Sequence, residues 1–264
     1  MIDPAIEKLC EDVRETWGCT SAPVDLNRIA SAEGIELAPG DYGHQFHGRL
    51  EYLLDEHLFI LYYPDAFLSA SQVRIRFTIA HELGHYYLPD QRQALMAGQS
   101  PDCHIGFISD KLSERQADTF AANLLIPRRL IQTHIDKQGM MTLKSIRDMA
   151  RTLDVSLPCA VIRYVQYATE ACGVVVSEAG KVKYYIASDE MEASGFRFMA
   201  RQMAIPRESK AWELLSSGRH VQIEGMKTAS NRWYSNRSQS SELWEDSIAL
   251  GYSDQVITLL SVEH

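Results

Sequence analysis

One segment limits the possible folds of this chain more than any other. It is an expected helix from about Ser71 to Leu88 that is apolar nearly all round. It carries the letters RFTIAHELGHYYL and is followed by Pro89, where a helix is expected to end. A helix with apolar residues on every face is buried. Buried polar side chains must find partners, so His81, Glu82 and His85 need a reason to lie there. The chain therefore has to fold into a core built around a polar centre.

The spacing of these three residues indicates what that centre does. His81 and His85 lie four residues apart, which places both imidazoles on one face of a helix with Cβ atoms about 5–6 Å apart. Both rings can then bind one metal ion at roughly 2.0–2.1 Å. Glu82 lies beside the metal, where a carboxylate can take a proton from water and pass it to a leaving amine. The pattern predicts metal-dependent peptide hydrolysis with Glu82 as the catalytic residue. The alternative, an exposed helix with two incidental histidines, fits the apolar flanks poorly.

A catalytic zinc site needs a third protein ligand, and a second expected helix, from about Asp110 to Leu125, offers one. Glu114 and Asp118 lie four residues apart on it and share a face. We expect Glu114 to bind the metal and Asp118 to accept the other N–H of a ligating histidine, which fixes the tautomer of that histidine. A solvated acidic face is the alternative, and the apolar residues around this pair favour packing.

Other polar residues leave alternatives open. Residues 90–108 show little periodicity and are expected to form a long loop, a kind of segment that is often functional. Cys103, His104 and Asp110, in or just after it, are rival third ligands. His104, Tyr86 and Tyr87 are candidates for stabilising the oxyanion of a transition state. The sequence does not indicate which residues bind the substrate.

The remaining pattern predicts an α+β fold in three parts. Residues 1–126 are expected to form a core with two early helices and a β-hairpin at GRLEYLLDEHLFILYY. Residues 127–169 are helical with a helix-turn-helix outline and are expected to pack on the core. Residues 170–264 change to strands and are expected to form a smaller C-terminal domain of mixed helices and strands.

Composition narrows the class of function. The net charge of −9 gives no general basic field for a nucleic acid. The second helix of the helix-turn-helix outline offers only Arg163 and Gln166 for base contacts, so direct DNA binding is not expected. Five cysteines without a CxxC spacing favour reduced thiols. The N-terminus lacks the apolar stretch of a signal peptide and no apolar run is long enough to span a membrane, so a cytoplasmic location is expected.

The two helical motifs also carry a resemblance. RFTIAHELGHYYL followed by ERQADTFAANLLIP resembles the ImmA/IrrE family of bacterial metallopeptidases, and PVDLNRIASAEGIEL and GRLEYLLDEHLFILYY match its usual lead-in. The resemblance implies a thermolysin-like (gluzincin) minimal zincin core, in which an edge strand near the active helix holds the substrate backbone. The limb from His57 to Tyr63 is the matching strand. It also implies metal binding by His81, His85 and Glu114 and catalysis by Glu82. Zinc is the expected metal, with manganese and iron left open.

The same resemblance implies a biological role. Members of the family cut a protein partner, typically a helix-turn-helix repressor of stress, phage or mobile-element genes. Some members add a C-terminal sensor of the GAF or PAS kind, with which residues 170–264 are compatible. The prediction is a metallo-endopeptidase making selective cuts in a protein partner. The alternative is a non-proteolytic, metal-stabilised regulatory or sensor protein that acts by binding a partner or DNA.

Overall fold

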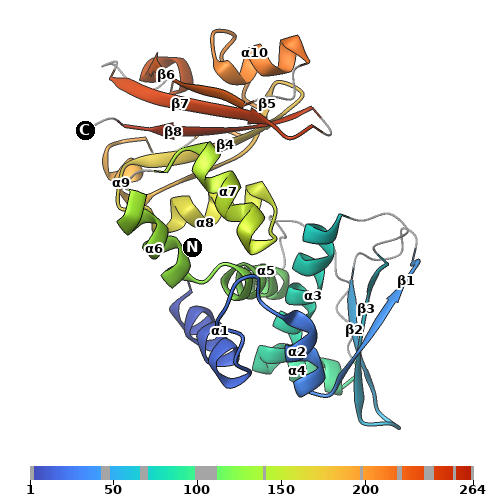
Figure 1. Ribbon diagram of the computed structural model, residues 1–264. Coiled ribbons are helices and arrows are strands. Elements are labelled where there is room, and N and C mark those ends of the chain that lie inside the picture. The colour runs from blue at the N-terminus through green and yellow to red at the C-terminus, as the bar shows by residue number, and fades with distance from the viewer. Residues whose placement is uncertain are drawn as a thin grey trace. The chain divides into compact units, whose positions relative to one another are not determined.

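A computed structural model describes residues 3–42, 48–65, 71–98, 112–138, 141–196, 199–218, 222–234, 241–251 and 254–262. Within these ranges the fold is mixed α+β, as the sequence predicts, with eleven helices and two sheets (Figure 1). The chain divides into two compact units. The N-terminal unit is Met1–Arg128 with Ala150–Ser156, and the C-terminal unit is Arg129–Met149 with Leu157–His264. The division into three domains stays a prediction, as do the thermolysin-like and GAF- or PAS-like details.

The N-terminal unit packs helices against a small sheet. Its elements in chain order are α1 (Pro4–Thr16), α2 (Leu26–Ala32), β1 (Ile35–Gly40), β2 (Arg49–Leu53), β3 (Leu58–Pro64), α3 (Gln72–Tyr87), α4 (Pro89–Met96) and α5 (Leu112–Leu125). The side chain of Asp3 caps α1 by accepting hydrogen bonds from the backbone N–H groups of its first turn. The guanidinium of Arg14 on α1 donates to the carbonyl of Leu124 at the end of α5. This hydrogen bond joins the C-terminal end of α5 to α1.

Helix α4 corrects part of the predicted loop. Residues 90–108 are expected to lack regular structure, but Pro89–Met96 is helical; residues 99–108 lie outside the described ranges. Leu88 ends α3 and also precedes α4. Proline suits the first position of a helix because its φ angle is already helical. The N–H that proline lacks would have no partner within the helix at that position. Pro89 therefore ends one helix and begins the next.

The small sheet corrects the expected substrate strand. Its order is β1-β3-β2. Strand β3, which holds most of the limb from His57 to Tyr63, pairs in parallel with β1 and antiparallel with β2. Both edges of β3 are thus used within the sheet, and no substrate backbone can add to it. The edge strands among the described residues are β1 and β2.

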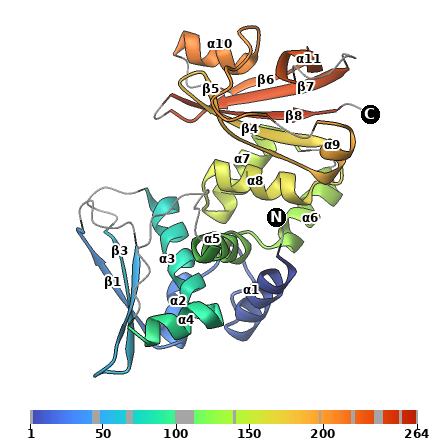
Figure 2. The ribbon, with the colours of Figure 1, turned by 180° about the vertical axis from the view of Figure 1, so that it is seen from behind.

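The elements after α5 build a second, larger sheet. They are α6 (Arg128–Gln138), α7 (Leu143–Leu153), α8 (Leu157–Tyr167), β4 (Cys172–Glu178), β5 (Lys181–Ala187), α9 (Asp189–Ala193), α10 (Lys210–Ser217), β6 (Gln222–Ala229), α11 (Ser230–Trp233), β7 (Glu242–Ala249) and β8 (Gln255–Ser261). The sheet is antiparallel throughout, in the order β5-β4-β8-β7-β6. Helix α10 covers one face and α8 the other (Figures 1 and 2). A turn at Ala179 and Gly180, both with positive φ, joins β4 to β5.

Helices α7 and α8 form the predicted helix-turn-helix outline, but α8 does not present a reading surface. Residues Cys159 to Val165 of α8 are all buried, and Arg163 is only 3% exposed. A recognition helix must present its side chains to the bases of the major groove. This burial supports the structural role of the helix pair over DNA reading.

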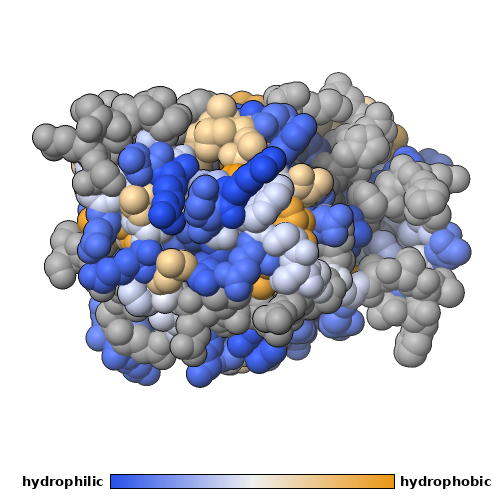
Figure 3. All heavy atoms as spheres, turned by 90° about the horizontal axis from the view of Figure 1, so that it is seen from above, coloured by the Kyte–Doolittle hydropathy of each residue, from blue (hydrophilic) through white to orange (hydrophobic). Residues whose placement is uncertain are grey.

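Two further features of the described residues are the polarity of one face and the state of the cysteines. Figure 3 views the molecule from the side where α10 lies in Figure 1, and its coloured atoms are mostly hydrophilic, with small separate apolar spots. Cys10, Cys19, Cys159 and Cys172 are buried and form no disulfide among the described residues. Among the described residues, none of the helices combines the length and apolar character of a membrane span.

Candidate metal centre

Helix α3 buries three polar side chains in the N-terminal unit. His81, Glu82 and His85 have no exposed surface. The helix lies along α5 and against β2 and β3, so its apolar residues pack on several sides, as expected for a helix that is apolar nearly all round. The polar centre predicted from the sequence therefore lies inside the N-terminal unit.

A close crossing of α3 and α5 brings Glu114 to the histidines. At the crossing, a Cβ atom added to Gly84 would lie 3.0 Å from the Cα atom of Ala117. Only small residues at these positions let two helix backbones approach so closely. Glu114 lies three residues before Ala117, in the first turn of the described helix, and is 3% exposed. The sequence HELGH thus supplies both the histidines and the contact that positions α5.

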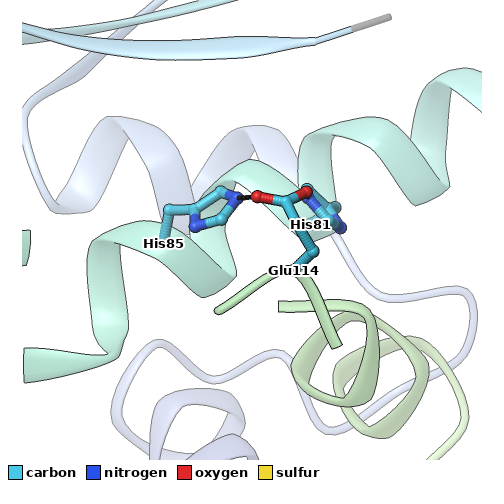
Figure 4. A group of neighbouring side chains, drawn as sticks. All are labelled: His81, His85 and Glu114. Atoms are coloured by element: carbon cyan, nitrogen blue, oxygen red, sulfur yellow. Dashed lines mark hydrogen bonds and ion pairs between the residues drawn. The ribbon is translucent and has the colours of Figure 1, made fainter. Parts of the chain in front are cut away.

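The donor atoms of His81, His85 and Glu114 converge on one point (Figure 4). The two Nε2 atoms are 3.1 Å apart. Glu114 places Oε2 3.4 Å from Nε2 of His81 and Oε1 3.7 Å from Nε2 of His85. Ligands held 2.0–2.1 Å from a tetrahedral zinc ion are separated by about 3.3–3.4 Å. The observed separations lie close to that spacing, so the residues fit a divalent metal.

A second group of contacts fixes the tautomers of both histidines. Nδ1 of His81 lies 2.8 Å from Oδ1 of Asp118, and Nδ1 of His85 lies 2.5 Å from Oε1 of Gln91. A carboxylate or amide oxygen accepts, so each Nδ1 carries the hydrogen and each Nε2 offers a lone pair. Two lone pairs and a carboxylate that face one another repel until a cation lies between them. The donor set therefore has the chemistry of a cation site.

Burial acts on the ionisation of the same groups. Burial, reinforced by the neighbouring His81, lowers the pKa of His85 to about 4. Burial raises the pKa of Asp118, while its hydrogen bond with His81 opposes that change. A histidine with a lowered pKa is neutral near pH 7, which is the form that binds metals.

Gln91 is a residue of this site that the sequence analysis missed. It lies on α4, in the segment expected to be a loop. Its amide oxygen accepts from Nδ1 of His85. Its amide nitrogen donates to the carbonyl of Ser113 and to Oε1 of Gln116, each at 3.2 Å. The signal that could have revealed it was Pro89, since a proline at the first position of a helix would have placed Gln91 in the turn directly after His85.

The backbone at the start of β2 lies against Glu82. A Cβ atom on Gly48 would lie 2.6 Å from Oε1 of Glu82 and 2.5 Å from Cγ2 of Thr78. Real Cβ atoms do not approach so closely, so only glycine fits at this position without a shift. The strand β2, one residue further on, therefore begins directly beside the carboxylate of Glu82.

The remaining predicted residues lie elsewhere or outside the described ranges. The hydroxyls of Tyr86 and Tyr87 donate to the carboxylate of Glu33, at 2.9 and 2.7 Å. These bonds direct both tyrosines towards Glu33, and their proposed action on an oxyanion stays a prediction. Cys103, His104 and Asp110 lie outside the described residues, so their parts as rival ligands or stabilisers also stay predictions.

Comparison with known proteins agrees with the resemblance seen in the sequence. Residues 54–163 match the family model described as the IrrE N-terminal-like domain, Peptidase_M78. This segment contains α3, α4 and α5 and with them His81, His85 and Glu114, which converge on the centre. No curated protein matches the chain.

Proposed function

We propose, from the match of residues 54–163 to the IrrE N-terminal-like domain, that this chain is a metal-dependent endopeptidase. The observation that carries the proposal is the convergence of His81, His85 and Glu114 within that segment. Zinc is the metal proposed, because two imidazoles and one carboxylate leave a fourth position open, as catalytic zinc sites do. Manganese and iron remain alternatives for the same donors.

In this proposal each residue has one task. A bound divalent ion would supply Lewis-acid chemistry, polarising a peptide carbonyl and making a water more acidic. His81, His85 and Glu114 would hold the ion through Nε2 and carboxylate oxygens. Asp118 would keep His81 in the tautomer that binds it. Glu82, adjacent to His81 in sequence, would accept the proton of the attacking water and deliver it to the leaving amine.

The position of β2 supports a proposal for where the substrate backbone binds. Among the described residues, β2 pairs with β3 and forms an edge of the sheet, and Gly48 brings its first residues against Glu82. We propose that an extended segment of the substrate adds to this edge by backbone hydrogen bonds. An edge strand beside the active helix would then be β2, in place of the limb from His57 to Tyr63.

For the biological role we keep the proposal that the sequence indicates. The substrate is a protein partner, with a helix-turn-helix repressor of a stress, phage or mobile-element response as the specific candidate. The C-terminal unit is proposed to be a sensor of the GAF or PAS kind. Its support is one antiparallel five-stranded sheet in which the first and last strands, β4 and β8, are neighbours at the centre.

The test is a search for new protein N-termini in native-host cells under several stresses. Cells carrying the wild-type protein are compared with cells carrying Glu82→Gln. This substitution keeps the shape of the side chain and removes the proton acceptor, so cleavage should fall by about 10²–10⁴-fold. The metal content of both purified proteins is measured in parallel and should be equal.

Each outcome decides between the two functions. One or a few new termini that depend on Glu82 would establish a selective peptidase and identify its substrate. If none forms under any condition while both proteins bind metal, proteolysis is wrong and the metal-stabilised regulator is favoured. Loss of metal from the Glu82→Gln protein would contradict the task assigned to Glu82.

A further inference from the structure

The two histidines of the metal centre have different partners behind them. His81 donates through Nδ1 to a carboxylate, Asp118 on α5, and His85 donates through Nδ1 to a neutral amide, Gln91 on α4. A carboxylate makes the ring that it accepts from more basic, and an amide does so less. The two imidazoles are therefore unequal as donors towards a shared cation.

The amide of Gln91 fits its place in only one orientation. Its oxygen accepts from Nδ1 of His85, and its nitrogen donates to the carbonyl of Ser113 and to Oε1 of Gln116. Turning the amide over would place two donors together at His85 and two acceptors together at Ser113. The orientation is thus fixed by α5, and it in turn fixes the ring of His85.

These contacts also join the elements that carry the ligands. Gln91 lies on α4, His85 on α3, and Ser113 directly precedes Glu114 on α5. One side chain therefore touches a histidine ligand and the backbone next to the carboxylate ligand. A shift of either ligand would lengthen a hydrogen bond of the same amide.

We propose that Gln91 is a positioning residue, which orients His85 for metal binding and keeps it in register with Glu114. This inference rests on the proposed metal site and adds a residue to it. Gln91 contacts neither substrate nor metal, and acts through Nδ1 of His85. Its oxygen does the positioning of the ring, and its nitrogen ties that oxygen to α5.

Two substitutions separate these parts. Gln91→Met has similar length and removes both the acceptor and the donor. Gln91→Glu removes the donor to Ser113 but keeps an acceptor for His85. Gln93→Met is the matched control, because Gln93 lies two residues further along α4 and is exposed.

The first measurement is the affinity of each metal-free, full-length protein for Zn²⁺, by competition with a chromogenic chelator. We expect Gln91→Met to bind Zn²⁺ about tenfold more weakly, the usual effect of losing a partner behind a ligand. Gln91→Glu should lose clearly less affinity than Gln91→Met, because its carboxylate still accepts from His85 while only the contacts to Ser113 and Gln116 are lost. Gln93→Met should match the wild-type protein.

The second measurement is the proton NMR signal of the imidazole N–H of His85 in ¹⁵N-labelled metal-free protein, assigned by its loss in His85→Gln. The signal should be retained in Gln91→Glu and Gln93→Met and lost to exchange in Gln91→Met. Equal weakening of Zn²⁺ binding in both Gln91 variants would mean that Gln91 only docks α4 on α5, and would overturn the proposal. Unchanged affinity in Gln91→Met would overturn it too. Failure of the wild-type protein to bind Zn²⁺ would instead refute the proposed metal site.

Discussion

Both units of the molecule bury carboxylates, but the two units surround them with different partners. In the N-terminal unit, the oxygens of Glu114 face the Nε2 atoms of His81 and His85. In the C-terminal unit, Glu245 accepts hydrogen bonds from the backbone N–H groups of Lys210 and Ala211, at the start of α10, and from Nε1 of Trp233. One carboxylate meets lone pairs and the other meets N–H donors.

This difference separates the proposed metal centre from a carboxylate that completes the fold. The first N–H groups of a helix have no partner within it, so a buried carboxylate there completes the fold. Asp246 does the same for α7 by accepting from the N–H of Leu143 at 2.7 Å. The donor atoms of His81, His85 and Glu114 converge instead on one point, an arrangement that a cation would stabilise. Burial alone does not indicate function; the chemistry of the neighbours does.

Removing Glu114 should have the largest effect, and it acts on metal binding. Loss of a partner behind a ligand lowers metal affinity about 10–100-fold, so loss of a ligand itself should exceed this, at roughly a thousandfold. The measurement is Zn²⁺ affinity of Glu114→Ala by chelator competition, with thermal unfolding of the metal-free protein alongside. Arg115→Ala, at the exposed neighbouring position, is the control.

Cys103→Ala tests the rival third ligand in the same assay. Its affinity should stay near the wild-type value. If Cys103→Ala loses more affinity than Glu114→Ala, the third ligand is assigned wrongly and the comparison between the two buried carboxylates fails.

Removing Glu245 should act on stability and leave metal binding unchanged. Glu245→Ala leaves three N–H donors of the C-terminal unit without their acceptor, which should cost about 3 kcal/mol of unfolding free energy. Burial raises the pKa of Glu245, which shows that burying its charged form is unfavourable. Removing the carboxyl group removes that cost and offsets part of the loss in unfolding free energy. Hydrogen exchange at the amides of α10 and denaturant unfolding followed by tryptophan fluorescence measure the effect.

Glu242→Ala is the matched control for Glu245. Glu242 lies on the same strand, is exposed, and pairs with Lys227 at the surface, so its loss should change stability by less than about 0.5 kcal/mol. A loss of Zn²⁺ affinity in Glu245→Ala, without one in Glu242→Ala, would show that the C-terminal carboxylate is more than structural.

Local patterns explain what the sequence could predict of this centre. The four-residue spacings of His81 and His85 and of Glu114 and Asp118 place each pair on one helix face, and the structure brings the two faces together. Gln91 was missed because Pro89 was interpreted only as the end of a helix. A proline signals a boundary, and local sequence does not say on which side of it the chain is helical.

Long-range pairing explains what the sequence could not predict of the fold. The hairpin of β2 and β3 is local and was expected. The parallel pairing of Ile35 with Phe59, which makes β3 a central strand, joins β1 to β3 although β2 lies between them in the sequence. The same holds for β4 and β8, which lie side by side at the centre of the larger sheet although they are the first and last of its strands. No turn signal marks such pairs.

The smallest effect is expected for a substitution at Gly48. It tests whether the carboxylate of Glu82 is positioned separately from the three proposed metal ligands. Backbone packs directly against this carboxylate: a Cβ on Gly48 would lie 2.6 Å from Oε1 of Glu82 and 2.5 Å from Cγ2 of Thr78. Gly48→Ala should therefore displace Glu82 and lower kcat/KM for the partner protein about tenfold, equivalent to roughly 1.4 kcal/mol of barrier. Zn²⁺ affinity should stay unchanged, because the atoms nearest to the added methyl group belong to Thr78 and Glu82 and to none of the three ligands. Adding Thr78→Ser to Gly48→Ala removes the methyl group of Thr78 that the new methyl group would meet, and should restore part of the activity. Thr78→Ser alone is the control.

A loss of Zn²⁺ affinity in Gly48→Ala, in parallel with the loss of activity, would mean that the start of β2 supports the whole centre. Glu82 would then share its packing with the ligands instead of being positioned separately from them.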